Sequence, residues 1–165
     1  MELRKKDVWD FTVKPFASLE KQWMLIAAGS RGEFNFMTAA WGGFGVLWNR
    51  PVTYIFVRPT RHTYGFLEKH DRYSLSFFQE RHRKALNIAG TRSGRDIDKL
   101  KACGFTAAYP DNTPSFNEAS LIMTNRKIYF QDIDPGHFLD SAIADNYSLK
   151  DYHRMYIGEI ISIYS

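Results

Sequence analysis

Hydrophobic residues occur mostly in short runs that glycine, proline and charged residues interrupt. Residues 23–28 (WMLIAA) form a continuous apolar run that the polar turn over residues 29–32 closes, which predicts a fully buried strand. Residues 36–42 predict a second strand, and the short link between the two predicts a hairpin. A glycine-rich segment follows and leads into another predicted strand over residues 52–57.

The remaining pattern adds more strands and a few short helices. The alternation of Trp9, Phe11 and Val13 predicts an edge strand that Pro15 ends. Further strands are predicted over residues 72–78, 119–124, 127–133 and 155–164, with a turn at Asn125-Arg126 and a loop over residues 110–114. Short helices are predicted over residues 60–70, 81–89 and 96–103, with Thr60 and Asp96 as N-caps and Gly90 and Gly104 as stops. Because strands dominate and βαβ alternation is absent over most of the chain, we expect a mainly β, largely antiparallel barrel with peripheral short helices.

Composition narrows the class of protein. The 165 residues predict a single domain over residues 1–165, and 44% hydrophobic residues exclude a disordered chain. The net charge of +4 suits a phosphate-bearing ligand but is too small and too dispersed to indicate nucleic acid. The one cysteine, Cys103, excludes an intrachain disulfide. Since no apolar run approaches about 18 residues and none follows the charged N-terminus, we expect no membrane helix, no secretory signal and a cytoplasmic protein.

Residues 58–63 (RPTRHT) are the first candidate for a binding site. Two guanidinium groups, an imidazole and two hydroxyls converge where a strand meets the start of a helix, whose free N–H groups favour an anion. Arginine and threonine add hydrogen bonds that suit a phosphate monoester. A solvated helix cap with incidental basic residues accounts for these six residues equally well.

Two further stretches have competing interpretations. Asn35 opens an apolar strand and by itself indicates only a satisfied turn, but the small residues that follow would let a flat ring lie against the backbone. Residues 91–99 (TRSGRDIDK) place an anion-friendly Ser-Gly turn before a helix, although an exposed connector is the favoured interpretation. Asp132, Asp134 and His137 resemble a metal cluster, but the Pro-Gly between them favours a turn.

Four sequence blocks resemble the flavin reductase-like family of FMN-binding split barrels, which includes flavoredoxins. Residues 35–42 (NFMTAAWG) resemble the family's Asn-x-Met-Thr-x-x-Trp strand, and residues 58–64 (RPTRHTY) resemble its phosphate-side turn. Residues 90–99 (GTRSGRDIDK) resemble its Ser-Gly-Arg-Asp block, and residues 151–160 (DYHRMYIGEI) resemble its closing His-x-x-x-Ile-Gly-Glu strand. The sequence departs from the compact members in a longer connection over residues 128–152, and it stops soon after the closing strand, where many members carry a tail that can border the flavin.

The resemblance implies a split β-barrel and a homodimer with FMN near the subunit interface. It also implies cofactor contacts, which we expect from Asn35, Phe36, Met37, Thr38, Ala39 and Trp41 at the ring, from Arg58, Thr60, Arg61, His62 and Thr63 at the phosphate and ribityl chain, and from Ser93, Arg95, Lys99 and His153 over or beside the flavin. Lys99 and the backbone near Thr38 are the candidates for stabilising a reduced, anionic flavin. No residue is expected to act as a covalent nucleophile.

A single cysteine and the absence of a metal-binding motif leave the chain without a redox group of its own, so redox activity requires a bound cofactor. The expected function is an oxidoreductase that passes electrons from NADH or NADPH to flavin or another acceptor. A flavoredoxin-like carrier that holds FMN and meets an electron-acceptor protein is the alternative. A basic β-barrel that binds nucleic acid is the third hypothesis, and the placement of the aromatics in core-like strands argues against it.

Overall fold

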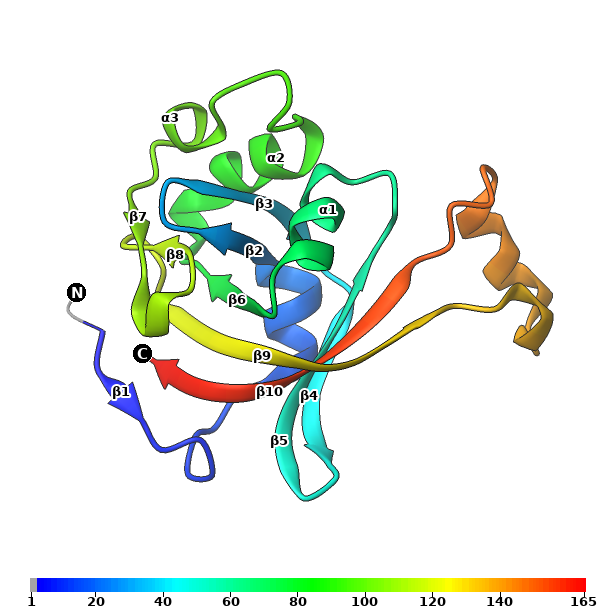
Figure 1. Cartoon of the computed structure of the whole chain (residues 1–165), viewed down its shortest axis with the longest axis horizontal. Helices are drawn as coiled ribbons and strands as arrows, with labels where there is room; N and C mark the ends of the chain where they lie inside the picture. The colour runs from blue at the N-terminus through cyan, green and yellow to red at the C-terminus, as the bar shows by residue number, and fades with distance from the viewer. Residues whose placement is uncertain (1–2) are drawn as a thin grey trace.

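The computed structural model describes residues 3–165 and is built around one antiparallel sheet (Figure 1). The strands are β1 (Lys5–Lys6), β2 (Met24–Ser30), β3 (Glu33–Ala39), β4 (Gly42–Leu47), β5 (Arg50–Val57), β6 (Arg72–Phe77), β7 (Ala107–Ala108), β8 (Ser115–Phe116), β9 (Leu121–Asp132) and β10 (Arg154–Tyr164). Their order across the main sheet is β3-β2-β6-β9-β10-β5-β4, with β1 paired to β10, while β7 pairs with β8 in a second small sheet. The sheet curls without closing, so the mainly β split barrel is confirmed.

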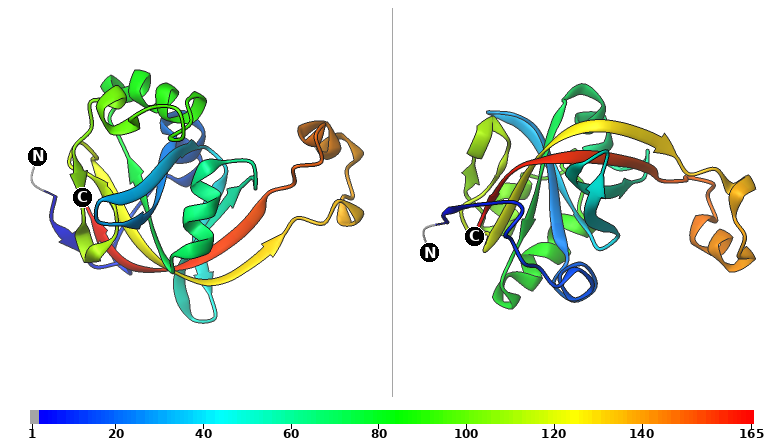
Figure 2. Two further views of the ribbon diagram at one scale, coloured as in Figure 1. Left: turned by 45° about the horizontal axis from the view of Figure 1, so that its top comes forward. Right: turned by 90° about the horizontal axis from the view of Figure 1, so that it is seen from below.

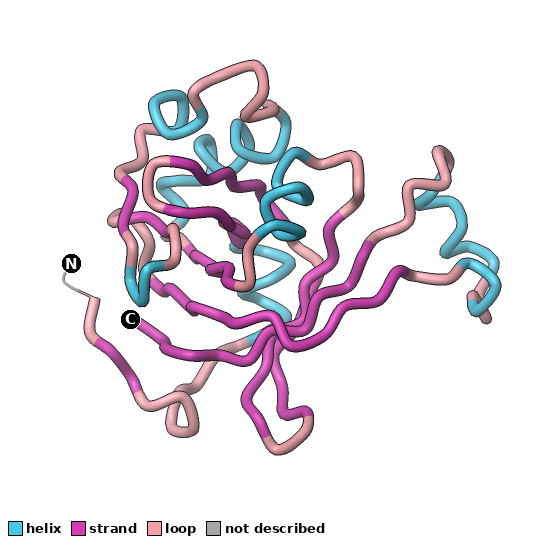
Figure 3. The backbone as a smooth tube through the Cα atoms, in the orientation of Figure 1, coloured by secondary structure: helices cyan, strands magenta, loops and turns pink. Residues whose placement is uncertain are grey.

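Short helices surround the sheet (Figure 3). They are the α-helices α1 (His62–Lys69), α2 (Arg83–Thr91) and α3 (Lys99–Cys103), the π-helix η1 (Ala17–Gln22), and the 3-10 turns η2 (Glu80–His82), η3 (Pro110–Asn112), η4 (Pro135–His137) and η5 (Ser141–Tyr147). None of the helices in residues 3–165 is long and apolar enough to cross a membrane.

The position of strand β2 in the sheet explains why its sequence is continuously apolar. Met24 and Ile26 point into one buried cluster, and Leu25 and Ala27 point into another on the opposite face of the sheet. The second cluster lies under α2 and includes Leu86. Side chains alternate between the two faces of a strand. When both faces are covered, every position is buried and the sequence is apolar throughout.

A buried polar group in the centre of the sheet corrects one prediction. Residues 121–132 form one long strand, β9, so the predicted turn at Asn125-Arg126 is wrong. The Asn125 side chain is fully buried, accepts a hydrogen bond from Thr53 Oγ1 at 3.0 Å and donates one to the Met123 carbonyl at 2.9 Å. Thr53 Oγ1 also bonds Tyr73 Oη at 2.7 Å. Because these partners satisfy the amide, asparagine is tolerated inside the strand.

The predicted glycine-rich segment is itself a strand. It forms β4, which pairs with β5 across a two-residue turn at Trp48 and Asn49, both with positive φ (51° and 57°). Such a turn matches the twist of a hairpin. Gly43 and Gly45 lie beside the Tyr54 ring, where an added Cβ would be 3.5 Å and 3.6 Å from the ring, an ordinary contact distance.

The other differences concern one predicted strand and the ends of several helices. The predicted edge strand at residues 9–13 is wrong, because that segment is irregular and Trp9 is 65% exposed; the N-terminal strand is β1. Helix α1 begins after Arg61 and not after Thr60, and α2 continues past Gly90. Asp98, not Asp96, caps α3 by accepting from the Lys101 N–H, and Gly104 ends it in the left-handed conformation as predicted.

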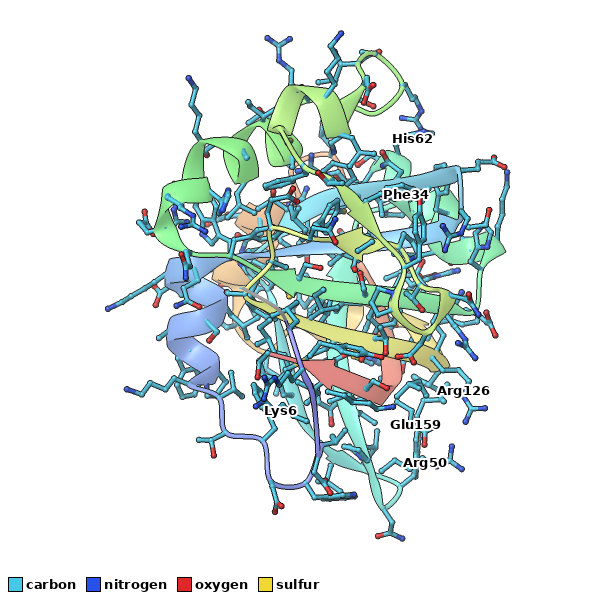
Figure 4. The ribbon with its side chains drawn as sticks, turned by 90° about the vertical axis from the view of Figure 1, so that its left-hand side faces the viewer. Lys6, Phe34, Arg50, His62, Arg126 and Glu159 are labelled. Atoms are coloured by element: carbon cyan, nitrogen blue, oxygen red, sulfur yellow. The ribbon has the colours of Figure 1, made fainter. Side chains whose placement is uncertain are left out.

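Strands β9 and β10 extend beyond the barrel and carry a projecting connection over residues 133–153, which we call the arm (Figures 1 and 2). The arm contains η4 and η5. Across three neighbouring strands, Glu159 of β10 joins Arg126 of β9 at 2.6 Å and Arg50 of β5 at 3.2 Å (Figure 4). In the same view His62 lies near the opposite end of the molecule, where the candidate site is found.

Candidate functional site

Two adjoining cavities lie where β3 and β5 end against α1, α2 and the loop that precedes α3. The first, the basic cavity, is lined by Asn35, Met37, Thr60, Arg61, His62, Thr63, Ala89, Thr91, Arg92, Ser93, Gly94, Arg95 and Lys99. The second, the flat cavity, is lined by Met37, Thr38, Ala39, Ala40, Trp41, Phe56, Arg58, Arg61 and His153. Met37 and Arg61 belong to both, so the two cavities form one continuous site.

Hydrogen bonds between distant segments assemble the basic cavity. Asn35 on β3 is buried and donates its side-chain N–H to Thr63 Oγ1 on α1 at 2.9 Å. Arg61, directly before α1, donates Nη1–H to the Gly90 carbonyl of α2 at 3.0 Å. The first N–H groups of α1 have no intrahelical acceptor, so the helix start favours an anion beside them.

The basic cavity is strongly positive. Arg61, Arg92, Arg95 and Lys99 line it, and within residues 3–165 none of its lining side chains is acidic. Burial lowers the pKa of His62, and the positive charges of Arg95 and Lys99 lower it further. This combination of cations and a helix start suits a phosphate group.

Lys99 is the least expected member of this cavity. Its side chain is only 6% exposed, and its Nζ donates to the Phe36 carbonyl at 2.5 Å and the Ala89 carbonyl at 2.7 Å. Burial lowers the pKa of Lys99 to about 8, and the nearby Arg61 contributes in the same direction. The lysine therefore ties α3 to β3 and α2 while its charge remains at the cavity.

A close approach of the loop to β3 fixes the far wall. A Cβ added to Gly94 would lie 2.2 Å from Asn35 Oδ1 and 3.5 Å from His62 Cδ2. Only glycine lets the Ser93–Arg95 backbone come this near, and Ser93 Oγ accepts from the Arg95 N–H at 3.2 Å to hold the turn.

The flat cavity has walls of mixed polarity, with small side chains along the end of β3. Thr38 points its hydroxyl away to the Leu86 carbonyl at 2.5 Å, and Ala39 and Ala40 add little bulk. Trp41 is 49% exposed, with its ring 5.2 Å from the His153 ring. A planar, partly apolar group can lie along such a surface.

Two predicted site residues are placed differently from the others. Phe36 lines neither cavity, because its side chain points to the opposite face of β3 and packs 4.8 Å from Phe116 in the core. Arg58 lines the flat cavity, but its guanidinium binds both carboxylate oxygens of Asp151, at 2.8 and 2.9 Å, and the Asn146 carbonyl at 2.7 Å. The remaining predicted residues all line one cavity or both.

Sequence reasoning missed some lining residues and named weaker candidates elsewhere. Arg92 and Gly94 lie inside the singled-out stretch 91–99, but Ala40, Phe56 and Ala89 carry no distinguishing chemistry in the sequence.

No group of three or more metal-ligating side chains gathers in residues 3–165, and Asp134 accepts from the Gly136 N–H in a turn. Cys103 donates to the Ala85 carbonyl, and burial raises the pKa of its thiol.

Comparison with protein-family models matches residues 16–164 to the flavin reductase like domain, and the chain therefore belongs to this family. The sequence resemblance is thereby confirmed, and a flavin-binding class of protein is established. No curated protein matched the chain.

Solved structures share the fold. A flavoredoxin from Methanosarcina acetivorans is 22% identical with a TM-score of 0.67, covering 87% of this chain and 68% of that one. An FMN-binding domain of a flavin reductases-like enzyme from Shewanella baltica is 18% identical with a TM-score of 0.70, covering 99% and 76%. The NADH:FAD oxidoreductase SgcE6 of Streptomyces globisporus is 14% identical with a TM-score of 0.65, covering 86% and 74%.

Proposed function

We propose that the chain is an FMN-binding oxidoreductase that passes electrons from NADH or NADPH to flavin or another acceptor. The observation that carries this proposal is that a basic cavity, suited to a phosphate, adjoins the flat cavity, whose small and aromatic side chains suit a ring system. The single domain predicted over residues 1–165 would hold one such site.

The residues present fit FMN. The phosphate would take its charge-assisted hydrogen bonds from Arg61 and the loop around Ser93, and the start of α1 would add backbone N–H groups. The ring would lie along β3 between Met37 and Trp41, where small side chains leave the backbone accessible. Bound FMN would supply the hydride and electron chemistry that the side chains of this chain do not offer.

The chain's own residues would bind the flavin, orient it and shield it from water. The neighbouring cations would favour negative charge on the bound flavin, and Trp41 would keep water from one side of the flat cavity. Neither cavity contains a cysteine, and Cys103 has a raised thiol pKa, so we assign no covalent step to the protein.

The phosphate assignment is tested by comparing two flavins. Arg61→Ala should weaken FMN binding by about 1–3 kcal/mol, the range for losing a charge-assisted hydrogen bond, while riboflavin, which lacks the phosphate, should lose far less. Flavin fluorescence titration measures both affinities. Arg81→Ala, which removes an exposed arginine outside both cavities, is the matched control. Equal losses for both flavins would place the phosphate elsewhere.

A flavoredoxin-like electron carrier is the second candidate, because the structural neighbours include flavoredoxins. Anaerobic absorbance spectra of the FMN-loaded protein, before and after NADH or NADPH, separate the two. Bleaching of the flavin band supports the oxidoreductase, whereas bound flavin that only a chemical reductant bleaches supports the carrier.

We also infer a homodimer, which the exposed apolar side chains on the projecting β9 end and the arm support. Leu139 is 102% exposed, Leu149 is 80%, Phe130 is 56% and Ile143 is 39%. Such side chains on one projection are typical of a surface that another protein covers. Light scattering at micromolar protein should give about twice the chain mass of 19.2 kDa. A monomer that still binds FMN would overturn this inference.

A further inference from the structure

The arm ends at a residue of the flat cavity, His153, and a second arm residue contacts that histidine directly. Tyr147, at the end of η5, places its hydroxyl 2.9 Å from His153 Nδ1. Both residues are buried, with 6% and 8% of their surfaces exposed, and their rings meet edge to face at 5.5 Å. The contact is therefore a fixed part of the fold and not a surface encounter.

A second attachment holds the same part of the arm. The Arg58 guanidinium donates hydrogen bonds to the Asp151 carboxylate and the Asn146 carbonyl. It also lies 5.2 Å from the centre of the Tyr147 ring. Arg58 thus fixes the arm on both sides of Tyr147. This arrangement defines where the phenol hydroxyl points relative to His153.

The protonation of this pair follows from hydrogen-bond accounting. Burial, together with the charge of Arg58, lowers the pKa of His153 to about 4, so the imidazole is neutral near pH 7. Burial also raises the pKa of Tyr147, so its hydroxyl keeps its proton. Within residues 3–165 that hydroxyl has no acceptor other than His153 Nδ1. Since a buried phenol O–H finds an acceptor, Tyr147 donates to Nδ1 and the imidazole proton resides on Nε2.

Two of the other side-chain donors at the flat cavity are fully turned to protein acceptors. Thr38 donates to Leu86, and Arg58 is held by Asp151 and Asn146. The Nε2–H of His153 is a neutral donor with no protein acceptor within the described part of the chain, on a residue that lines the cavity.

We propose that Tyr147 is a positioning residue that holds His153 in its Nε2–H form, so that His153 donates a hydrogen bond to a carbonyl oxygen of the substrate beside the flavin. In the reaction proposed above, on which this inference rests, that oxygen belongs to the carboxamide of the nicotinamide. A neutral donor orients the carboxamide without taking up a proton, so a hydride can leave the nicotinamide ring with no proton transfer to the protein.

The tautomer is tested on the protein without flavin. In nitrogen-15 NMR near pH 7, His153 should show an unprotonated Nδ1 and a protonated Nε2. In Tyr147→Phe the Nδ1 signal should shift, because its hydrogen bond is lost. Tyr152→Phe is the matched control, since Tyr152 packs 4.9 Å from Tyr147 and its hydroxyl makes no hydrogen bond within residues 3–165. A protonated Nδ1 in the parent protein would overturn the proposal.

Kinetics test the role in orientation. Tyr147→Phe should lower kcat/KM for NADH or NADPH about 5- to 20-fold, the effect of one hydrogen bond, with FMN affinity unchanged. His153→Ala should lower it at least as much, and Tyr147→Phe should add nothing on top of it, because the tyrosine acts through the histidine. Full additivity, or an equal loss in Tyr152→Phe, would overturn the role. If the parent protein oxidises neither nucleotide, the proposed function and the substrate part of this inference fall, while NMR still decides the tautomer.

Discussion

Replacing Lys99 by methionine isolates the energetics of a buried cation. Lys99 is 6% exposed, lies near Arg61, and its ammonium group donates to the Phe36 and Ala89 carbonyls. Methionine keeps much of the length and apolar stem but removes both hydrogen bonds. Each carbonyl that is left unpaired costs about 1–3 kcal/mol, whereas removal of the buried charge relieves a penalty of about 3 kcal/mol near pH 7.

The pH dependence separates these opposing effects. Folded Lys99 loses its proton near pH 8, while the unfolded chain keeps it to about the usual 10.5. Between these values the unfolded state binds more protons, so the stability contributed by Lys99 rises with pH and is lowest below pH 8. With these two pKa values, the parent protein gains about 1.3 kcal/mol relative to Lys99→Met between pH 7 and pH 9.

Urea unfolding of both proteins at pH 7 and pH 9 measures this difference. Subtracting the variant from the parent at each pH cancels the other titrating groups. Lys101→Met is the matched control, because Lys101 is an exposed lysine on the same helix. A stability gap between parent and Lys99→Met that is identical at both pH values would refute the depressed pKa and the burial that explains it.

Three glycine substitutions test local packing. Gly158→Ala should cost about 1–3 kcal/mol in urea unfolding, because the new Cβ would lie 2.4 Å from the hydroxyl oxygen of the fully buried Tyr73. Gly65→Ala, with nothing within 4 Å inside α1, should instead stabilise by about 0.5–1 kcal/mol, so equal signs for the two would contradict the packing argument. Gly94→Ala should push the loop away from Asn35 and weaken FMN binding at least as much as riboflavin binding, as fluorescence titration would show.

Much of the fold could be predicted because local pattern and tertiary burial agree. The continuous apolar run that became β2 is buried on both faces, and the Arg72–Phe77 strand was predicted to within one residue. The predicted break at Asn125 fails for a physical reason. Asparagine favours turns when it is solvated, but Thr53 and the Met123 carbonyl satisfy it inside the sheet. Thr53 is 72 residues away, and a local pattern carries no information about such a partner.

The sequence predicted the parts of the candidate site that lie in short motifs. It did not predict the contacts between residues far apart in the chain. The stretches beginning at Asn35, at Arg58 and at Thr91 each have recognisable anion or ring chemistry, and the fold brings them to one site. The sequence did not indicate that Arg58 would form an ion pair with Asp151, since the two lie 93 residues apart in the chain. Nor did it indicate that Lys99 would be buried against two carbonyls.

The basic cavity carries an electrostatic cost that a bound anion would relieve. Burial lowers the pKa of His62 and of Lys99; the charges of Arg95 and Lys99 lower the His62 pKa further, and the charge of Arg61 lowers the Lys99 pKa further, so these cations repel one another. A ligand that binds only the folded state stabilises it by about 2.7 kcal/mol at a concentration 100 times its Kd. A phosphate dianion would add relief of this repulsion to its hydrogen bonds, whereas an uncharged ribityl chain would not. In the proposed site, this clustering of cations would therefore favour FMN over riboflavin.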